Sequence, residues 1–369
     1  MVVWWARFTA LAGYASYISI RTPRGLMSLA RSEQTMILRI WHAAACLAIL
    51  MLLGAPARAD VVRSEQEELS NSSNLPITEW RDENTKLLGI IVMIHGVTLH
   101  AGVFDVAARN LASSGFLVVA PDLRGFGRWV ANESVPEEDR KVNYTRSLGD
   151  TITLIEHLRE QHPQMPIFCA GESLGANMAI NLAAIRPEAV DGLILSSPCI
   201  YRRIFIGPYM VPDAVKSFKP STQLSMKWYI GKRLSDDPKV EKGYRLDPSI
   251  RKTLSFRELI QSKYALQRGV LAARKVPAKI PVLILQGTAD NLFKPEGVNA
   301  LMAMLPCADE KVQWFKGRGH LLLETAYIRP EVVSTINGWL NDRLGQPELS
   351  AARVPDSKQP AGEDSKQVQ

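Results

Sequence analysis

The sequence predicts an α/β fold, a mostly parallel central sheet flanked by helices, and three observations support this. Short continuous apolar runs, the pattern of strands buried on both faces, recur along the chain. Segments with helical character alternate with them, as is typical of a parallel sheet. Small and polar residues follow the runs, at the edge where such sheets bind ligands. The runs are 87–94, 116–120, 167–170, 190–195 and 281–285, with a weaker one at 312–315.

Helices are expected between these strands. Asp150 is suited to the N-cap of the helix that precedes the third run. A helical stretch covers 256–273, and a last helix covers 330–344 with Pro330 in its first turn. Such helices between successive strands can cover both faces of the predicted sheet.

The charge distribution argues against a nucleic-acid partner. The chain has 369 residues, 46% of them apolar, and a formal net charge of +7. Residues 1–59 hold six basic residues and one acidic residue, so the remainder carries 38 basic and 36 acidic residues. The body is nearly neutral and has no basic stripe with interleaved aromatic residues. We therefore expect no nucleic-acid binding.

A segment that resembles a signal peptide spans 36–59. A short basic segment opens it at Met36, and an eleven-residue apolar run follows at 43–53. The segment ends in Ala57-Arg58-Ala59, which matches a signal-peptidase cleavage site. Eleven apolar residues are fewer than the about 20 that span a bilayer. We predict export, to the periplasm or outside the cell, with cleavage near Ala59. The alternative is an uncleaved leader that anchors the protein in a membrane.

Composition divides the remaining chain into three parts. We predict a polar linker over 60–77, an α/β domain over 78–345 and a disordered tail over 346–369. Within the domain, about 80 residues, 199–279, separate two strands that need only a single helix between them. An insertion at the carboxyl end of a parallel strand lies over the ligand site, so we predict that it forms a lid.

The predicted lid holds an apolar stretch. Phe205, Ile206, Tyr209 and Met210 are candidate substrate-binding residues in an acyl-binding wall. Equally, these side chains could pack against the core and hold the insertion in place, without contacting substrate. The sequence leaves both alternatives open.

Three cysteines lie beyond the leader: Cys169, Cys199 and Cys307. Their wide spacing fits neither a zinc cluster nor a dense disulfide framework. We expect each to be a small buried residue. Export would allow a Cys199–Cys307 bridge, although nothing in the sequence selects it.

The third strand-like run ends in Gly171-Glu172-Ser173-Leu174-Gly175 and passes directly into a helical segment. A serine on a sharp strand-to-helix turn projects its hydroxyl above the sheet, in a strained backbone that small neighbours permit. The pattern is short, and it also fits a turn with an incidental serine. Its interpretation as a nucleophile therefore depends on the rest of the chain.

A serine hydroxyl needs a base, and the base needs an orienting acid. In open α/β sheets the partners follow the serine in the order acid, then histidine. His320 is the only one of the six histidines that follows Ser173, and it lies just after the sixth strand. Asp290 comes directly after the fifth strand, 30 residues before His320. Asp290 has many competitors for the role of the acid, including Asp191, Asp213, Asp236, Asp237, Asp247 and Glu296.

An oxyanion on the bound substrate needs two backbone N–H donors. We expect Leu174 to supply one, as the residue after the nucleophile. We expect Val97 to supply the other, from the loop that begins with His95 and Gly96 after the first strand. His95 itself is expected to be structural, bonded within that loop.

Taken together, these motifs resemble the α/β-hydrolase family, and more closely its monoacylglycerol lipase, lysophospholipase and serine aminopeptidase-like branch. The matching stretches are His95-Gly96-x-x-x-His100-x-Gly102-x-Phe104, Asp122-Leu123-Arg124-Gly125-Phe126-Gly127, Gly171-Glu172-Ser173-Leu174-Gly175, Leu285-Gln286-Gly287-x-x-Asp290 and Gly319-His320. They cover about residues 87–343 in order. The resemblance implies an α/β-hydrolase fold with a helical cap inserted after the sixth family strand. It also implies Ser173 as nucleophile, Asp290 and His320 as its partners, and Val97 and Leu174 as oxyanion donors.

The chain departs from the family pattern in two places. Arg128 and Trp129 follow the Gly-Phe-Gly loop where the family often has a small hydroxyl residue. The region before Leu87 is short, with only 77–80 strand-like, so we expect the leading antiparallel strands to be reduced.

We therefore predict a serine hydrolase that cleaves carboxylic esters through an acyl-enzyme, without a metal or organic cofactor. Its expected substrate is a small acyl ester or lipid, with membrane contact possible through the leader or the cap. The alternatives are an aminopeptidase of the same fold, for which Glu172 or a cap carboxylate would bind the free amine, and a non-catalytic binding protein. The sequence does not indicate the oligomeric state.

Overall fold

The computed structural model describes residues 61–65, 75–131, 135–202, 220–226 and 234–345. The predicted leader and tail lie outside these residues, as do Phe205, Ile206, Tyr209 and Met210. In the described part of the chain, no helix is both long enough and apolar enough to cross a bilayer.

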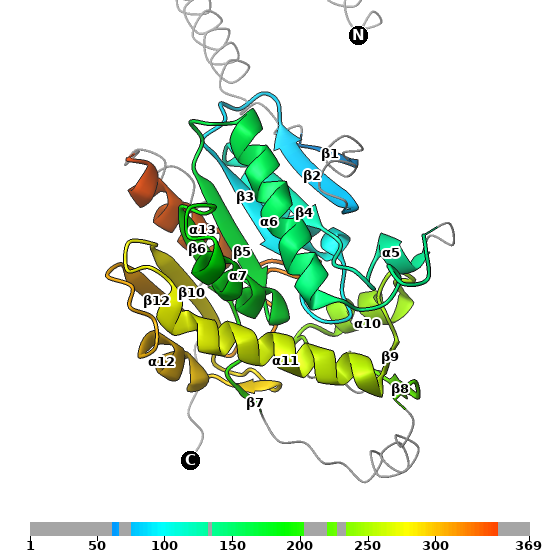
Figure 1. The fold of residues 1–369 in the computed structure, drawn as a ribbon. Helices are drawn as coiled ribbons and strands as arrows, with labels where there is room; N and C mark the ends of the chain where they lie inside the picture. Colours follow the sequence, from blue (N-terminus) through cyan, green and yellow to red (C-terminus); the bar gives the residue numbers. More distant parts are fainter. Residues whose placement is uncertain (1–60, 66–74, 132–134, 203–219, 227–233, 346–369) are drawn as a thin grey trace, which may run out of the picture. The chain divides into compact units, whose positions relative to one another are not determined.

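An eight-stranded sheet in the order β1-β2-β4-β3-β5-β6-β10-β12 forms the centre of the fold (Figure 1). Every neighbouring pair from β4 to β12 is parallel, whereas β1 and β2 are antiparallel to their neighbours. The mostly parallel sheet predicted from the sequence is therefore confirmed. The strands are β1 Val61–Glu65, β2 Ile77–Asp82, β3 Gly89–Ile94, β4 Phe116–Pro121, β5 Ile167–Glu172, β6 Gly192–Ser196, β10 Val282–Gly287 and β12 Glu310–Phe315.

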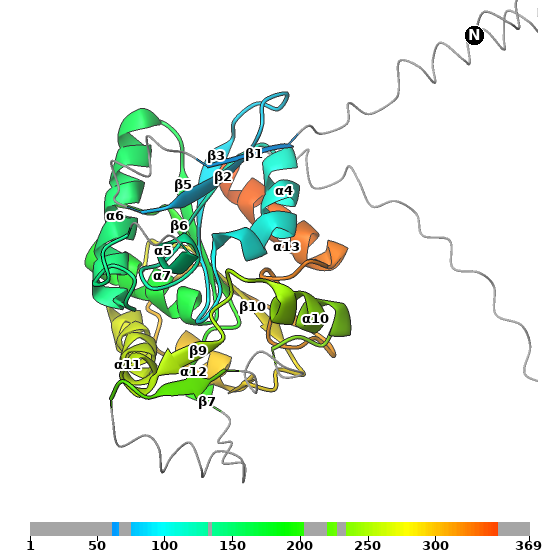
Figure 2. The ribbon, with the colours of Figure 1, turned by 90° about the vertical axis from the view of Figure 1, so that its right-hand side faces the viewer.

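Helices cover both faces of this sheet, with α4 and α13 on one side and α6 and α7 on the other (Figure 2). The helices are η2 Ala101–Phe104, α4 Asp105–Ser113, α5 Arg128–Ala131, α6 Tyr144–Gln161, α7 Leu174–Ile185, α10 Pro238–Leu246, α11 Phe256–Ala272, η4 Ala273–Lys275, α12 Gly297–Met302 and α13 Pro330–Leu344. Two small antiparallel sheets pair β7 Tyr201–Arg202 with β11 Phe293–Lys294, and β8 Gln223–Ser225 with β9 Thr253–Ser255.

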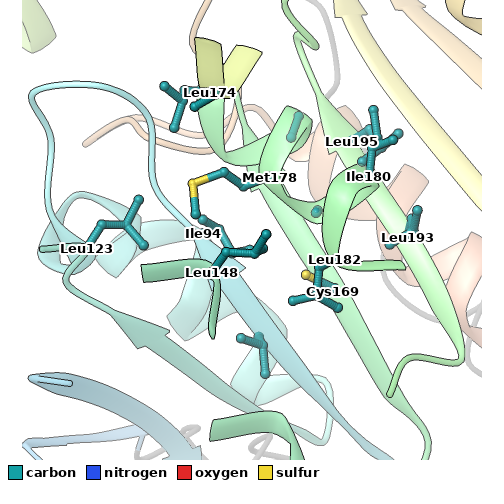
Figure 3. Packing of buried hydrophobic residues seen from close by; sticks show 14 of the residues in the cluster. Ile94, Leu123, Leu148, Cys169, Leu174, Met178, Ile180, Leu182, Leu193 and Leu195 are labelled. Carbon is teal, nitrogen blue, oxygen red and sulfur yellow. The ribbon is translucent and has the colours of Figure 1, made fainter. Parts of the chain in front are cut away.

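The strand pleat divides the core into two layers. Along β3, Ile91 and Met93 pack in the layer under α4 and α13, while Ile90, Val92 and Ile94 pack in the layer under α6 and α7. Successive side chains of a strand point to opposite faces, so a strand buried on both sides reads as a continuous apolar run. Figure 3 shows the second layer, where α7 lies against the sheet.

The N-terminal part of the domain differs from the prediction of a linker over 60–77. Residues Val61–Glu65 form strand β1, which pairs with all but the first residue of β2 in antiparallel register. Arg63 lies over the Trp80 ring and pairs with Asp105, so this edge strand is fixed to β2 and α4. The polar composition misled the prediction because an edge strand with one open side tolerates polar residues.

Asp150 does not cap the helix that precedes β5. That helix begins at Tyr144, and the Asn143 side chain accepts a hydrogen bond from the Arg146 N–H at 3.0 Å. Asp150 lies in the second turn, where its carboxylate receives the Arg124 guanidinium at 2.6 Å. Tyr144 is buried, so the helix starts earlier than the apolar pattern after Asp150 indicated.

The described part of the insertion between β6 and β10 contacts loops at the carboxyl edge of the sheet. The Arg251 N–H donates to the Thr98 carbonyl at 2.9 Å, in the loop after β3. The Tyr244 hydroxyl of α10 donates to the Glu324 carbonyl, in the segment after β12. Helix α11 packs along α7. The lid role of the segment remains a prediction.

The Cys199–Cys307 bridge that export would allow does not form, because the three described cysteines are free thiols. Cys199 follows the carboxyl end of β6, next to Ser173. Cys307 precedes β12 and donates to the Ile280 carbonyl before β10 begins. The two lie at opposite edges of the sheet, roughly 15–20 Å apart by strand length, whereas a disulfide needs Cα atoms within about 7 Å.

Candidate active site

Ser173 occupies the turn between β5 and α7 with φ 58° and ψ −121°, in the left-handed region that disfavours side chains. Strain of this kind costs about 1–3 kcal/mol and persists only where the surroundings impose it. Here the imposing contact is a close approach, since a Cβ atom on Gly175 would lie 1.8 Å from the Ile94 carbonyl oxygen. The elbow is therefore pressed against the end of β3, and Ser173 is held at the tip.

Ser173, His320 and Asp290 form one chain of hydrogen bonds. The His320 Nε2 lies 2.8 Å from the Ser173 Oγ, and the His320 Nδ1 lies 2.7 Å from the Asp290 Oδ2. All three residues are buried. The structure thus brings together the three residues that the sequence selected, from segments up to 147 positions apart.

Asp290 is held by the loop after β10. Its Oδ1 accepts the N–H groups of Leu292 and Phe293 at 2.8 and 3.0 Å. Its Oδ2 faces His320 and also accepts the Gln286 side-chain N–H at 3.3 Å. The Phe293 ring stacks on the imidazole, with centroids 5.6 Å apart and an interplanar angle of 27°. The histidine is therefore fixed by a carboxylate at one edge and an aromatic ring on one face.

These contacts set the charges of the pair. Burial lowers the pKa of His320, but the Asp290 carboxylate, assisted by Glu172, outweighs it, so the pKa lies above its usual value. Burial likewise raises the pKa of Asp290, but the His320 imidazole and the backbone donors bring it below its usual range. Asp290 is an anion that stabilises the imidazolium form of His320. A neutral imidazole with Nδ1–H directed at Asp290 presents Nε2 to accept the Ser173 proton.

The backbone beside Ser173 fits the predicted oxyanion donors. Leu174 is the first residue of α7, so its N–H belongs to the set that helical hydrogen bonding leaves free. Gly96 lies against the elbow, because a Cβ on it would be 3.4 Å from the Ser173 Cβ, and Val97 follows it directly. His95 is structural as predicted: it bonds the Gly96 carbonyl at 2.8 Å and accepts the Leu123 N–H at 3.0 Å.

Burial lowers the pKa of His95 to about 4. Its ring is therefore neutral at physiological pH, with Nδ1 as the donor to Gly96 and Nε2 as the acceptor from Leu123. His95 ties the loop after β3 to the loop after β4.

Cys199 is a site residue that the sequence reasoning did not select. Its Sγ lies 3.4 Å from the Ser173 Oγ, and the Asn177 side chain bonds both its N–H and its carbonyl. Burial raises the pKa of Cys199 well above its usual value, so it is a neutral thiol. Its only signal in the sequence is its position three residues after β6, which is too general to mark it.

The Glu172 carboxylate, considered above as a subsite for a substrate amine, is enclosed by the protein. It is fully buried and accepts the N–H groups of Leu322 and Glu324 at 2.7 and 2.6 Å, together with the Ser196 hydroxyl at 2.5 Å. Its lone pairs are occupied by the protein itself. This role in an aminopeptidase is therefore wrong.

Of the predicted site residues, the substrate-binding group Phe205, Ile206, Tyr209 and Met210 lies outside the described residues, and its role stays a prediction. Among the residues that are described, no group of three or more His, Cys, Asp or Glu side chains is placed to hold a metal ion.

The sheet topology, the strained serine at the elbow and the buried Ser-His-Asp chain define an enzyme of the α/β-hydrolase fold. The family model for serine aminopeptidase S33 matches residues 85–325. The chain belongs to this family, as the motifs had indicated.

Its relatives include lipases. The human monoglyceride lipase is 27% identical over 72% of this chain and 86% of its own length. The monoacylglycerol lipase of Mycolicibacterium smegmatis is 23% identical over 69% of this chain and 89% of its own length.

Solved structures agree with the fold. The Paleococcus ferrophilus monoacylglycerol lipase has a TM-score of 0.57 and 27% identity over 73% of this chain and 98% of its own. A soluble variant of the Saccharomyces cerevisiae monoglyceride lipase, solved with a substrate analogue, has a TM-score of 0.64 and 20% identity over 78% of this chain and 97% of its own. Within its family, the chain is a hydrolase that acts on ester bonds.

Proposed function

We propose that the protein hydrolyses carboxylic esters of the monoacylglycerol or lysophospholipid kind through an acyl-enzyme on Ser173. The observation that carries this proposal is the pair of hydrogen bonds at His320, 2.8 Å to the Ser173 Oγ and 2.7 Å to the Asp290 Oδ2. The relatives that act on monoacylglycerols suggest the substrate class.

The chemistry follows from that geometry. His320 Nε2 takes the hydroxyl proton as the Ser173 Oγ attacks the ester carbon, and Asp290 stabilises the imidazolium that forms. The carbonyl oxygen becomes an oxyanion, which the N–H groups of Val97 and Leu174 stabilise. The imidazolium then protonates the departing alcohol, and water activated by the same histidine releases the acid from Ser173.

The test is covalent labelling of the protein with a fluorophosphonate probe. Ser173→Ala should lose labelling and lower p-nitrophenyl butyrate turnover by at least about 10³-fold, because loss of a triad nucleophile costs several orders of magnitude. Ser334→Ala, at an exposed serine whose hydroxyl bonds its own helix backbone, is the matched control. A Ser173→Ala protein that still labels, or retains turnover within about tenfold, would refute the proposal.

A substrate series separates the remaining alternatives. We expect turnover of acyl glycerol and lysophospholipid esters, with a dependence on chain length, and none of aminoacyl amides. Release of amines from aminoacyl substrates at a comparable rate would favour the aminopeptidase alternative. Absence of both activities, together with absence of labelling, would favour a binding protein.

We also propose that residues 36–59 direct export, since the apolar run and the Ala-x-Ala site suit a cleavable signal. N-terminal sequencing of the protein recovered from fractionated cells tests this. A mature start at Asp60 is the expected result, and an intact leader in the membrane fraction would favour an anchor.

A further inference from the structure

Two buried glutamates lie behind the candidate site, and the mechanism above uses neither. Glu172 is the last residue of β5 and precedes Ser173, while Glu324 lies four residues after His320. Both side chains are fully buried. A buried carboxyl group is costly unless it is hydrogen-bonded, so each must have a structural or functional compensation.

Glu172 is surrounded by hydrogen-bond donors. Its Oε1 accepts the Ser196 hydroxyl at 2.5 Å and the Leu322 N–H at 2.7 Å. Its Oε2 accepts the Glu324 N–H at 2.6 Å, and the Leu323 N–H reaches both oxygens at 3.2 and 3.1 Å. Burial raises the pKa of Glu172 above its usual value, and the hydrogen bonds from the Ser196 hydroxyl and the backbone offset part of that rise. The backbone N–H groups of Leu322, Leu323 and Glu324 can only donate, so most of the surroundings of Glu172 favour the anionic form.

The Glu324 carboxyl group, by contrast, has a single hydrogen-bond donor. Its Oε1 accepts a hydrogen bond from the Gly96 N–H at 2.6 Å. Its Oε2 is buried and has no partner among the described residues. Burial raises the pKa of Glu324 well above its usual value, and the charge of Glu172 adds to the rise. Two interacting buried carboxyl groups do not both ionise readily, and Glu172 has several backbone donors where Glu324 has one, so the geometry favours the neutral form at Glu324.

The contacts of the two carboxyls join three segments of the site. Glu172 connects the elbow to the backbone of 322–324, directly after His320. Glu324 connects that same segment to Gly96, whose neighbour Val97 is the proposed oxyanion donor. A displacement of about 1 Å at such a donor can lower a rate about 100-fold.

We propose that Glu172 and Glu324 are positioning residues for the ester hydrolysis proposed above, on which this inference rests. Neutral Glu324 holds the turn that presents the Val97 N–H, and the Glu172 carboxylate holds the histidine segment against the nucleophile elbow. Glu324 is neutral and Glu172 is an anion in this proposal, so replacement of each by neutral glutamine should have different effects.

Replacement by glutamine distinguishes the two residues. Glutamine reproduces a neutral carboxyl, so Glu324→Gln should keep kcat within about threefold and the melting temperature within about 2 °C. At Glu172 a glutamine directs N–H groups at backbone N–H donors, so Glu172→Gln should lower the melting temperature by about 5–10 °C or prevent folding. Equal behaviour of the two glutamine variants would overturn the assignment of charge.

Loss of the Glu324 contact tests its positioning role. Glu324→Ala and Glu324→Asp remove or shorten the link to Gly96, and we expect kcat to fall about 10–100-fold with KM within threefold. Phenylboronic acid, which forms a tetrahedral adduct on the serine oxygen, should lose affinity by a similar factor in these variants but not in Glu324→Gln. If either folded variant shows wild-type kcat and boronate affinity, Glu324 does not position the donor.

Failure of this inference is distinguishable from failure of the proposed function. Fluorophosphonate labelling of the unsubstituted protein reports on Ser173 alone. The melting temperatures of the two glutamine variants report on the carboxyls whether or not the protein turns over an ester.

Discussion

His100 and Asp247 join two segments that lie 147 positions apart, with the His100 Nε2 3.0 Å from the Asp247 Oδ2. His100 belongs to the loop after β3, and Asp247 is the C-cap residue of α10 in the insertion. The His100 Nδ1 accepts the Gly102 N–H at 3.1 Å, so Nε2 carries the proton and donates to the carboxylate. The loop that holds Val97 is thus fastened to the insertion.

This contact should stabilise the docked insertion. The hydrogen bond from His100, opposed by burial, holds the pKa of Asp247 below its usual value. A group with a lowered pKa contributes stability at neutral pH and loses it as the pH falls through its folded-state pKa. Because both side chains are partly exposed, we expect His100→Ala and Asp247→Ala each to lower the free energy of unfolding by about 0.5–1.5 kcal/mol.

Urea denaturation of the two single variants and the double variant measures the coupling. The double variant should lose less than the sum of the singles, and this deficit should shrink at acid pH. The exposed Lys141–Glu137 pair serves as the control, and its removal should change nothing measurable. Strict additivity at His100 and Asp247 would contradict the prediction.

Asp290 should set the pH dependence of turnover. The base form of His320 is neutral, and its pKa is raised, so kcat/KM should rise with pH through a value above about 6.5. Asp290→Asn removes the charge that causes the rise. We expect the acid limb of the profile to move to lower pH while the plateau falls by about 10⁴-fold.

A pH–rate profile with a p-nitrophenyl ester checks this prediction. Asp236→Asn provides the comparison, because Asp236 accepts the Gly319 N–H in the same loop, whereas the His320 ring bonds Asp290 and Ser173. An acid limb that stays in place in Asp290→Asn would show that another group governs the titration.

Gly175 should tolerate no side chain, because a Cβ there would lie 1.8 Å from the Ile94 carbonyl oxygen and 2.6 Å from its carbon. Both obstacles are backbone atoms of a buried strand, which cannot move without displacing the sheet. Gly175→Ala should lower the free energy of unfolding by at least about 3 kcal/mol, or leave no folded protein.

Gly149→Ala is the matched control for that substitution. Gly149 lies inside α6, and apart from its own helix backbone and chain neighbours no atom of the described residues lies within 4 Å of the position that a Cβ would take there. Alanine should therefore raise stability by about 0.5–1 kcal/mol through helix propensity. Thermal unfolding of both variants compares them directly. A Gly175→Ala protein as stable as the wild type would show that the elbow is not closely packed.

Local patterns predicted where the strands lie along the chain and which residues carry the chemistry. Buried parallel strands produce continuous apolar runs, and all six predicted runs correspond to strands. Ser173 is the central residue of a Gly-x-Ser-x-Gly pattern, which describes one turn between a strand and a helix. His320 was selected because no other histidine follows that serine, and Asp290 because it follows a strand, so neither choice required knowledge of a contact.

The sequence by itself therefore determined the α/β class, the position of the elbow, and the serine and aspartate that both lie within hydrogen-bonding distance of His320. Only the tertiary structure decided that Glu172 and Glu324 connect the segments around them, that His100 pairs with Asp247, that Phe293 stacks on His320, and that β1 extends the sheet. The physical reason is range. Hydrophobic periodicity and turn motifs depend on a few neighbouring residues. The contacts named here depend on how distant segments meet in the folded domain.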